Sequence, residues 1–356
     1  YVKVGRKGNA KWNFSETFTW SSPGFDLNDM GYMKETDYLM NETEIMYRQT
    51  DIWKIFRYNA FTLSQKNMWN YGGTPFSNNA SLRWQSMTMN RYEWDVKETF
   101  AWNWLDSRLL RGGPDVRFGS YFLTSAKFNT DKAKRMMFML KYEGDHNFEG
   151  NRFNTISPSL TFRLGNHVYL SGQLDYAWNT DEMQYVATTS PLSSSSLAPY
   201  YYVMGHMDQK TYGLTLKLQV NVTPDISIQF YGAPFTSIAK YDDFKLAADT
   251  KSHTFENRFQ RIDPDQLTYA DGVYTIGEGA GQMPFRNPDF RFNEFRSNLV
   301  ARWEYLPGST LYFVWEHRMS NRDNWYSSGW GSNLDRMWGL PATNTFMIKM
   351  NYWFNL

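Results

Sequence analysis

The sequence predicts an all-β protein, namely a transmembrane antiparallel β-barrel of an outer membrane with about 14 strands. Three observations predict it. Apolar and polar residues alternate with period two along many short stretches, tight turns alternate with long polar connections, and aromatic residues make up 18% of the chain. No run of residues approaches the roughly 20 apolar positions that a membrane-spanning helix needs.

The composition excludes several classes of protein. A mean hydropathy of -0.61 with 21% charged residues is ordinarily typical of a soluble chain, but a barrel strand is polar at every second position and gives similar values. The chain has no Cys, which excludes disulfides and thiolate sites and suits a protein that crosses an oxidising periplasm. Its net charge of +1 provides no attraction for nucleic acid.

The alternation is clearest at the C-terminal end, in "NTFMIKMNYWFNL" (344–356). A terminal strand must pair early because it would otherwise leave an open edge. Its apolar face therefore predicts an insertion signal formed by Phe346, Ile348, Met350, Tyr352, Phe354 and Leu356. A soluble β-sandwich or propeller also alternates, but the outward faces here are almost wholly apolar and aromatic, which favours a membrane barrel.

The opposite face of the same strands is polar and carries charges of both signs. Such a face is typical of a water-filled or loop-plugged lumen. The residues expected to face the lumen are Arg163, Asp175, Lys217, Gln219, Arg296, Asn298, Arg302, Glu304, Glu316, Arg318, Lys349 and Asn351.

The connections also alternate along the chain. Short turns are expected at 7–10, 50–52, 90–92, 130–133, 164–166, 223–225 and 306–308, and long polar segments at 21–36, 67–80, 104–116, 144–152, 180–208, 239–289 and 320–342. This asymmetry is typical of periplasmic turns and extracellular loops. Residues 1–356 are thus expected to form a single barrel domain, with 1–9 as a lead-in or the remnant of an extra strand.

The segment 239–289 is expected to be a long extracellular loop and the main functional element, because structureless loops of this length are uncommon. It is predicted either to plug the lumen or to form a docking surface, and a mobile surface loop is the alternative. The residues selected for this role combine aromatic rings with both charges: Phe255, Arg258, Arg261, Asp263, Asp265, Tyr269 and Tyr274.

No motif for catalysis or metal binding is present. The five His lack zinc-type spacing, the acidic pairs Asp242/Asp243 and Asp263/Asp265 lack EF-hand spacing, and "GEGAGQM" (277–283) lacks the Lys of a phosphate-binding loop. No nucleophile elbow occurs either. The sequence therefore predicts a non-enzymatic protein with no metal and no cofactor.

Several stretches resemble the C-terminal β-barrel of the DUF5916 proteins. They are "SSPGFDLNDMGYM" (21–33), "LRGGP" (110–114), "SIQFYGAPFTSIAKYDDFK" (227–245) and "RNPDFRFNEFRSNLVARWEYLPGSTLYFVWEHR" (286–318). The resemblance implies an outer-membrane protein of the Bacteroidota, in which the DUF5916 proteins are common. The DUF5916 proteins usually carry an N-terminal family 9 carbohydrate-binding-like domain. Because no such domain precedes Tyr1, the resemblance also implies an incomplete chain whose full barrel has more strands.

Two functions are expected from these observations. The first is a porin-like transport or solute-binding barrel, for which the resemblance makes an oligosaccharide the candidate solute. The second is a barrel subunit of a larger outer-membrane assembly for secretion, insertion or nutrient uptake. The expected partners are outer-membrane lipid and lipopolysaccharide, and in the second case other outer-membrane proteins or lipoproteins.

Overall fold

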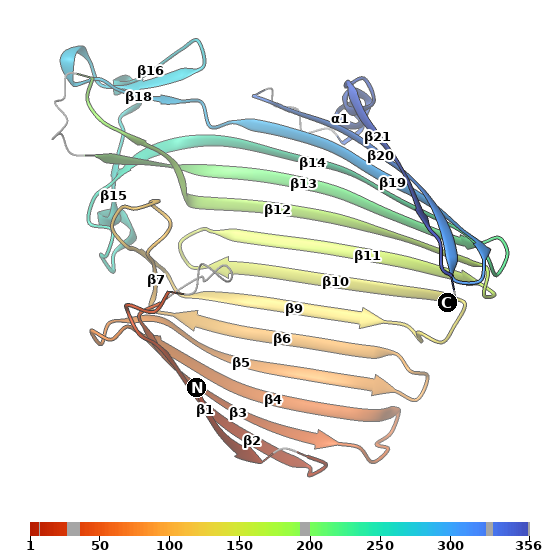
Figure 1. The fold of residues 1–356 in the computed structure, drawn as a ribbon. Helices are drawn as coiled ribbons and strands as arrows, with labels where there is room; N and C mark the ends of the chain where they lie inside the picture. The colour runs from red at the N-terminus through yellow and green to blue at the C-terminus, as the bar shows by residue number, and fades with distance from the viewer. Residues whose placement is uncertain (7, 27–35, 193–199, 325–329, 355–356) are drawn as a thin grey trace.

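The computed structural model describes residues 1–6, 8–26, 36–192, 200–324 and 330–354. It confirms an all-β chain built from antiparallel strands (Figure 1). The strands of the main sheet are β1 (Val2–Arg6), β2 (Trp12–Ser21), β3 (Tyr38–Gln49), β4 (Phe56–Trp69), β5 (Pro75–Thr88), β6 (Glu93–Trp102), β9 (Tyr121–Asn129), β10 (Met136–Asn147), β11 (Arg152–Leu164), β12 (Val168–Thr189), β13 (Tyr201–Asn221), β14 (Ile226–Ala247), β15 (Phe259–Arg261), β19 (Phe290–Leu306), β20 (Ser309–Asp323) and β21 (Ala342–Asn351).

Smaller elements gather at the end of the sheet that carries the long connections; in Figure 1 most of them lie at the left, and α1 lies near the top, right of the centre. They are the hairpin of β7 (Trp104–Asp106) and β8 (Val116–Phe118), the small sheet of β16 (Leu267–Ala270), β17 (Val273–Ile276) and β18 (Met283–Arg286), the 3₁₀ helices Phe255–Arg258, Pro264–Gln266 and Gly279–Gly281, and the helix α1 (Trp330–Trp338). Among the described residues, no helix is both long and apolar enough to cross a membrane.

The main sheet is a simple meander in which each strand pairs antiparallel with the next one along the chain. It has 16 strands, of which β15 pairs only with β14 and lies off the path, so 15 strands form the row from β1 to β21. Without β1 the row has 14 strands, which is the number predicted, and β1 is the additional strand that was expected near residues 1–9. Every short turn predicted from the sequence connects two of these strands, and the turns at Gly165 and Gly308 use the positive φ that glycine adopts readily, 62° and 78°.

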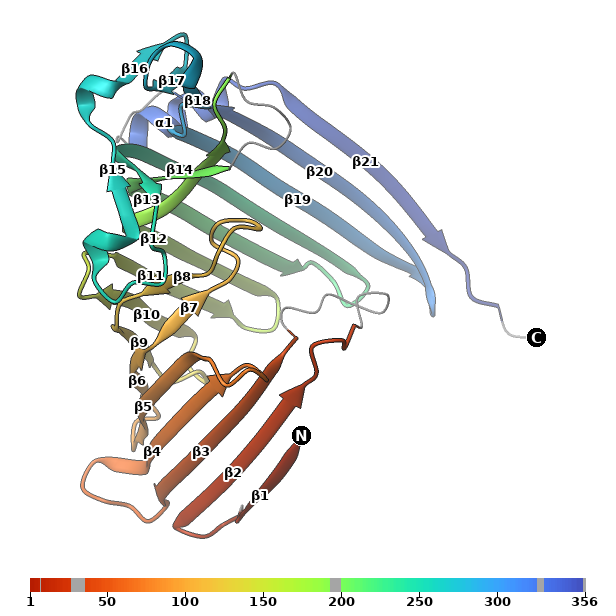
Figure 2. The same ribbon diagram turned by 90° about the vertical axis from the view of Figure 1, so that its left-hand side faces the viewer.

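The sheet curls into a C, with β1 and β21 at its two ends (Figure 2). Within the described residues β1 pairs only with β2, and β21 pairs only with β20. The expected closed barrel is therefore not observed, and the sheet is an open one. The pairing that would close the barrel is that of β1 with β21. Local alternation in the sequence cannot predict a contact between the first and the last strand.

Strands β12, β13 and β14 are 22, 21 and 22 residues long, about twice the expected strand length. They extend into the segments 180–208 and 239–289, which were expected to be loops throughout. The sequence signal ends early because charged residues stand on the face that is apolar nearer the turn end, as at Asp208 and Lys240, which lie side by side. The extension is instead held by packing, since Met207 and Tyr241 are buried in a cluster with Phe244 and Phe285.

Two connections predicted to be long are short. Residues 70–74 join β4 to β5, and residues 148–151 join β10 to β11. The polar runs 67–80 and 144–152 misled the prediction because side chains such as Asn78 and Asp145 lie within strands.

Candidate functional site

The pairing register places all the residues predicted to face the lumen on one face of the sheet. For example, Lys217 pairs with Tyr231, Tyr231 with Asn298, and Asn298 with Glu316, and directly paired residues point to the same side. The remaining members follow by the same register and by the alternation of each strand. We call this side the polar face.

The polar face is the concave one. A hollow of about 560 Å³ is lined by residues of β3, β4, β5, β6, β9, β10 and β11, including Glu42, Ser64, Lys97, Glu143 and Phe153. One hollow can contact so many consecutive strands only on the inside of a curved sheet. The hollow of the curl in Figure 2 is thus polar.

Charges of both signs line this hollow. The cations Lys66 and Lys97 line it together with the carboxylates of Glu42, Glu143 and Asp145. These residues were not predicted from the sequence, although Thr62, Ser64 and Lys66 of β4 and Ser77, Asn79 and Ser81 of β5 are polar at every second position and carry the same alternation signal. A wall that mixes both signs does not select ions of one charge, but it can solvate or bind a neutral polar molecule.

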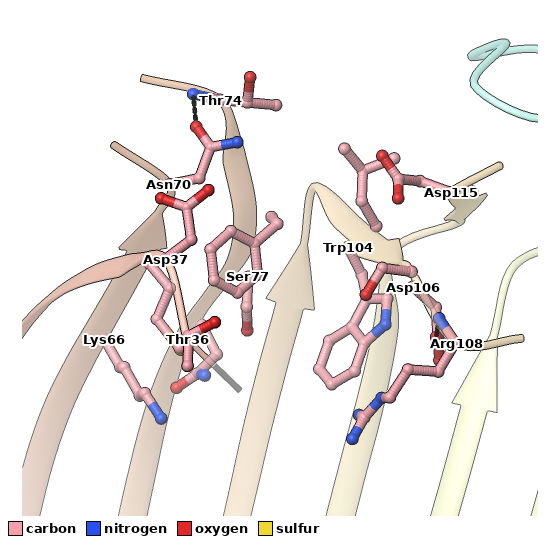
Figure 3. A pocket seen from close by; sticks show the side chains of 15 residues that line it. Thr36, Asp37, Lys66, Asn70, Thr74, Ser77, Trp104, Asp106, Arg108 and Asp115 are labelled. Atoms are coloured by element: carbon pink, nitrogen blue, oxygen red, sulfur yellow. Dashed lines mark hydrogen bonds between the residues drawn. The ribbon is translucent and has the colours of Figure 1, made fainter. Parts of the chain in front are cut away.

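A second hollow, of about 500 Å³, lies at the loop end between the β4–β5 connection and the β7–β8 hairpin (Figure 3). Its size falls within the range of small-molecule sites, about 300–1,000 Å³. The indole of Trp104 lies in the middle of its lining, and its ring packs edge-on against Tyr121 at 5.7 Å. Asp37, Asn70 and Arg108 add polar groups around the ring.

Local hydrogen bonds fix the polar groups of this second hollow. The Asp106 Oδ1 accepts from the backbone N–H groups of Arg108 and Leu109 at 2.7 and 3.0 Å, and Asp37 Oδ1 accepts from the Tyr71 N–H at 3.0 Å. Both hollows share Lys66 and Asn79. They form one continuous surface that leads from the loop end down the concave face.

The segment 248–262 is anchored by a buried ion pair. Arg258, 1% exposed, donates from Nη1 and Nη2 to the Glu149 carboxylate at 2.9 and 2.8 Å, and from Nε to the Ser252 carbonyl at 2.8 Å. Glu149 Oε2 also accepts from the Gly119 N–H at 2.9 Å. A Cβ at position 119 would lie 2.5 Å from the Glu149 carboxyl carbon, so glycine permits this approach.

Further contacts join the same segment to the β7–β8 hairpin. Thr250 Oγ1 donates to the Asp115 carbonyl at 2.7 Å, and the Arg117 N–H donates to the Thr250 carbonyl at 2.9 Å. Leu110 and Val116 of the hairpin region, both fully buried, pack in one cluster with Phe259. Three parts of the chain that are distant in sequence thus form a single packed layer at the loop end.

The residues predicted to plug the lumen or dock a partner divide into two groups. Phe255, Arg258 and Tyr274 are packed into the loop-end layer, where Tyr274 stacks on Phe285 at 5.4 Å. The others lie nearer solvent: Arg261, Asp263, Asp265 and Tyr269. Of the residues that line the two hollows, none belongs to 239–289. The segment is therefore a packed cover of the strand extensions.

The three residues of the predicted insertion signal that belong to β21 lie on the convex face. Phe346 pairs with Trp315, Ile348 with Phe313 and Met350 with Leu311, and all three side chains of β21 are at least 63% exposed. Tyr352 and Phe354 follow the strand, with their rings stacked at 6.2 Å, and Leu356 lies outside the described residues. No group of three His, Asp or Glu side chains that could hold a metal ion occurs in the part of the chain that is described.

His206 lies between two carboxylates at the loop end. Its Nδ1 lies 3.0 Å from Glu182 Oε1, and its Nε2 lies 3.5 Å from Asp208 Oδ2. Burial alone would lower the pKa of His206, but Glu182, Asp208 and Asp242 together outweigh burial and raise this pKa above its usual value.

We expect the strand extension to loosen as pH rises. Because the folded pKa of His206 is raised, its stabilising contribution is complete below about pH 6.5 and is lost as pH rises through the folded value. Hydrogen exchange of residues 201–207, corrected for intrinsic rates, should be slower at pH 6 than at pH 8. The variant His206→Gln should lose this difference, and an unchanged difference would contradict the role of His206.

No curated protein and no solved structure matched the chain. A family model described as "Domain of unknown function (DUF5916)" matches residues 2–356, which confirms the family suggested by the sequence motifs. The chain therefore belongs to the DUF5916 family.

Proposed function

We propose that the chain forms the wall of an outer-membrane β-barrel that transports or binds a polar solute. The observation that carries the proposal is the contrast between the faces of the sheet. Large apolar side chains remain exposed along the convex face, among them Leu63 at 55%, Leu82 at 57%, Leu174 at 51% and Ile348 at 72%. Polar residues such as Glu16 and Glu98 interrupt this face, but so large an exposed apolar surface is unfavourable in water and favourable in lipid.

The height of the apolar surface supports the same proposal. Along β13 and the residue after it, this surface runs from Tyr212 to Val222, about 11 residues, which matches the length of a tilted membrane-spanning strand. Next to Tyr212 stand Tyr176 and Trp178, whose rings stack as an aromatic belt would. Lys210 stands level with Trp178 on the convex face and Asp208 follows one step further along β13, so the strand extensions would stand clear of the bilayer.

The concave surface supports a polar solute. The two contiguous hollows offer one indole, several amides and hydroxyls, and charges of both signs. Trp104 could stack on a sugar ring while Asn70, Asn79 and Asp37 exchange hydrogen bonds with hydroxyl groups, so an oligosaccharide remains the candidate solute. The proposal includes no chemical step, metal or cofactor.

The second candidate function is a subunit of a larger outer-membrane assembly. The observation that favours it is the open sheet, whose two edge strands are exposed along their whole length. Outer-membrane proteins or lipoproteins would then contact these edges or the loop-end layer, where Tyr269 is 55% exposed.

The membrane part of the proposal is tested by one pair of substitutions. Leu218 pairs with Leu170 and Phe230 on the convex face, and Gln219 is its neighbour on the concave face. Leu218→Arg should lower the free energy of unfolding in lipid vesicles by about 2–4 kcal/mol, whereas Gln219→Arg should change it little. Equal losses would mean that the convex face does not contact lipid.

The transport part is tested at the loop end. Replacing residues 264–286, which contain β16 to β18, by a short Gly-Ser linker would uncover part of the loop-end layer. Single-channel conductance in planar bilayers should rise if the barrel conducts and this layer narrows its mouth. An unchanged conductance together with loss of a co-purifying outer-membrane protein would favour the assembly function instead.

A further inference from the structure

The two edges of the sheet carry information about what completes it. Strand β1 is exposed at every residue, and so is β21. Within the described residues, each has a sheet partner on one side only. In lipid an unpaired row of backbone N–H and C=O groups costs several kcal/mol for each group, so both edges need a partner if the proposed membrane function is correct.

The direction of the strands restricts that partner. All pairings of the main sheet are antiparallel, and the row from β1 to β21 holds 15 strands. Because direction reverses at each step and 15 is odd, β1 and β21 run the same way, from the loop end to the turn end. Direct closure of β1 on β21 would therefore be a parallel pairing, unlike every other pairing in this sheet.

A second copy of the chain cannot supply the missing antiparallel partner. Copies inserted in one membrane share the same orientation, since their loops all lie on one side. In each copy both edge strands run from the loop end to the turn end, so any edge of one copy meets any edge of another in parallel. Self-association would therefore also pair the edge strands in parallel.

We propose that strands not contained in residues 1–356 fill the gap between β1 and β21, and that their number is odd. The first of them pairs antiparallel with β1 and the last pairs antiparallel with β21, so each of these runs from the turn end to the loop end. Their chemistry follows from the neighbouring strands. Val2 and Val4 continue the convex face, and Lys3 continues the polar face, so the added strands alternate apolar outside and polar inside.

This inference rests on the proposed membrane function, and cysteine cross-linking of the full protein in its native outer membrane tests it. The chain has no Cys of its own. A disulfide needs Cβ atoms about 3.5–4.5 Å apart, whereas one intervening strand separates its two neighbours by about 10 Å. Lys3→Cys would be combined in turn with a Cys on the polar face of β21, at Thr343, Thr345, Met347 or Lys349.

We expect none of these pairs to form a disulfide, within one chain or between two chains. Matched controls are Lys3→Cys with Thr17→Cys and Glu316→Cys with Thr345→Cys, which are directly paired positions and should cross-link. A β1–β21 disulfide in a yield similar to the controls would overturn the proposal, because it would show that the row closes on itself or on a copy.

Hydrogen exchange supplies the positive readout. If added strands are present, the amides of β1 and β21 in the native protein should exchange at least about tenfold more slowly than in the unfolded chain, as those of β12 do. Exchange as fast as in the unfolded chain would show that the edges are free and would overturn the proposal. If alkaline pH extracts the protein from membranes, the proposed membrane function is wrong as well. If the protein resists extraction but β1 and β21 form a disulfide, only the proposal of additional strands between them is wrong.

Discussion

The triple substitution Phe346→Ser, Ile348→Ser and Met350→Ser is expected to abolish the membrane-assembled form of the protein. All three side chains lie on the convex face of β21. Removing each from lipid should cost about 1.5–3 kcal/mol, or about 5–9 kcal/mol together. This loss is comparable with the whole stability of a typical domain, about 5–15 kcal/mol. The measurement is the amount of heat-modifiable protein in the outer-membrane fraction.

The control for this prediction lies on the other face of the same strand. Thr343→Ser, Thr345→Ser and Lys349→Ser change side chains on the polar face, and assembly should continue. The difference in assembly between the two triple variants shows whether the convex face of β21 contacts lipid or water. Side chains 64%, 72% and 63% exposed would lose little by becoming serine in water, so normal assembly of the first variant would exclude a lipid-facing strand.

The sequence predicted the strands and their faces because that information is local. Between Leu214 and Val222 alternate residues are apolar, and this pattern alone determines a strand and the side on which Lys217 and Gln219 lie. The tight turns were equally local, since Gly165 and Gly308 mark them. The members of the polar face are predictable from the sequence for the same reason.

The loop-end layer could not be predicted because its contacts are distant in sequence. Arg258 and Glu149 are 109 residues apart, and no local sequence pattern around either residue predicts their ion pair. Trp104 was also missed, because an isolated tryptophan in a polar segment has no periodic pattern. The closure of the sheet depends on β1 and β21, the most distant strands of the row, and on what lies between them.

The ion pair of the loop-end layer is expected to be the strongest single contact there. Arg258→Met should destabilise the layer by about 3–5 kcal/mol, because it leaves the Glu149 carboxylate enclosed without its cation. The Glu149 side chain is only 13% exposed, and the Gly119 N–H, which also donates to it, carries no full charge. Limited proteolysis within 248–262 should accelerate accordingly, while the hydrogen exchange of β2 to β6 stays unchanged.

Two further variants separate the buried charge from the loss of packing. Arg261→Met, three residues away, removes an exposed guanidinium that lies 3.6 Å from Asp243 and is 75% exposed, so its effect should stay within about 0.5 kcal/mol. The double variant Arg258→Met with Glu149→Met removes both charges and should recover part of the stability lost in Arg258→Met alone. If the double variant is no more stable than the single one, the isolated carboxylate is not the cause, and the layer depends instead on the hydrogen bonds from Arg258 to the carbonyls of Ser252 and His253.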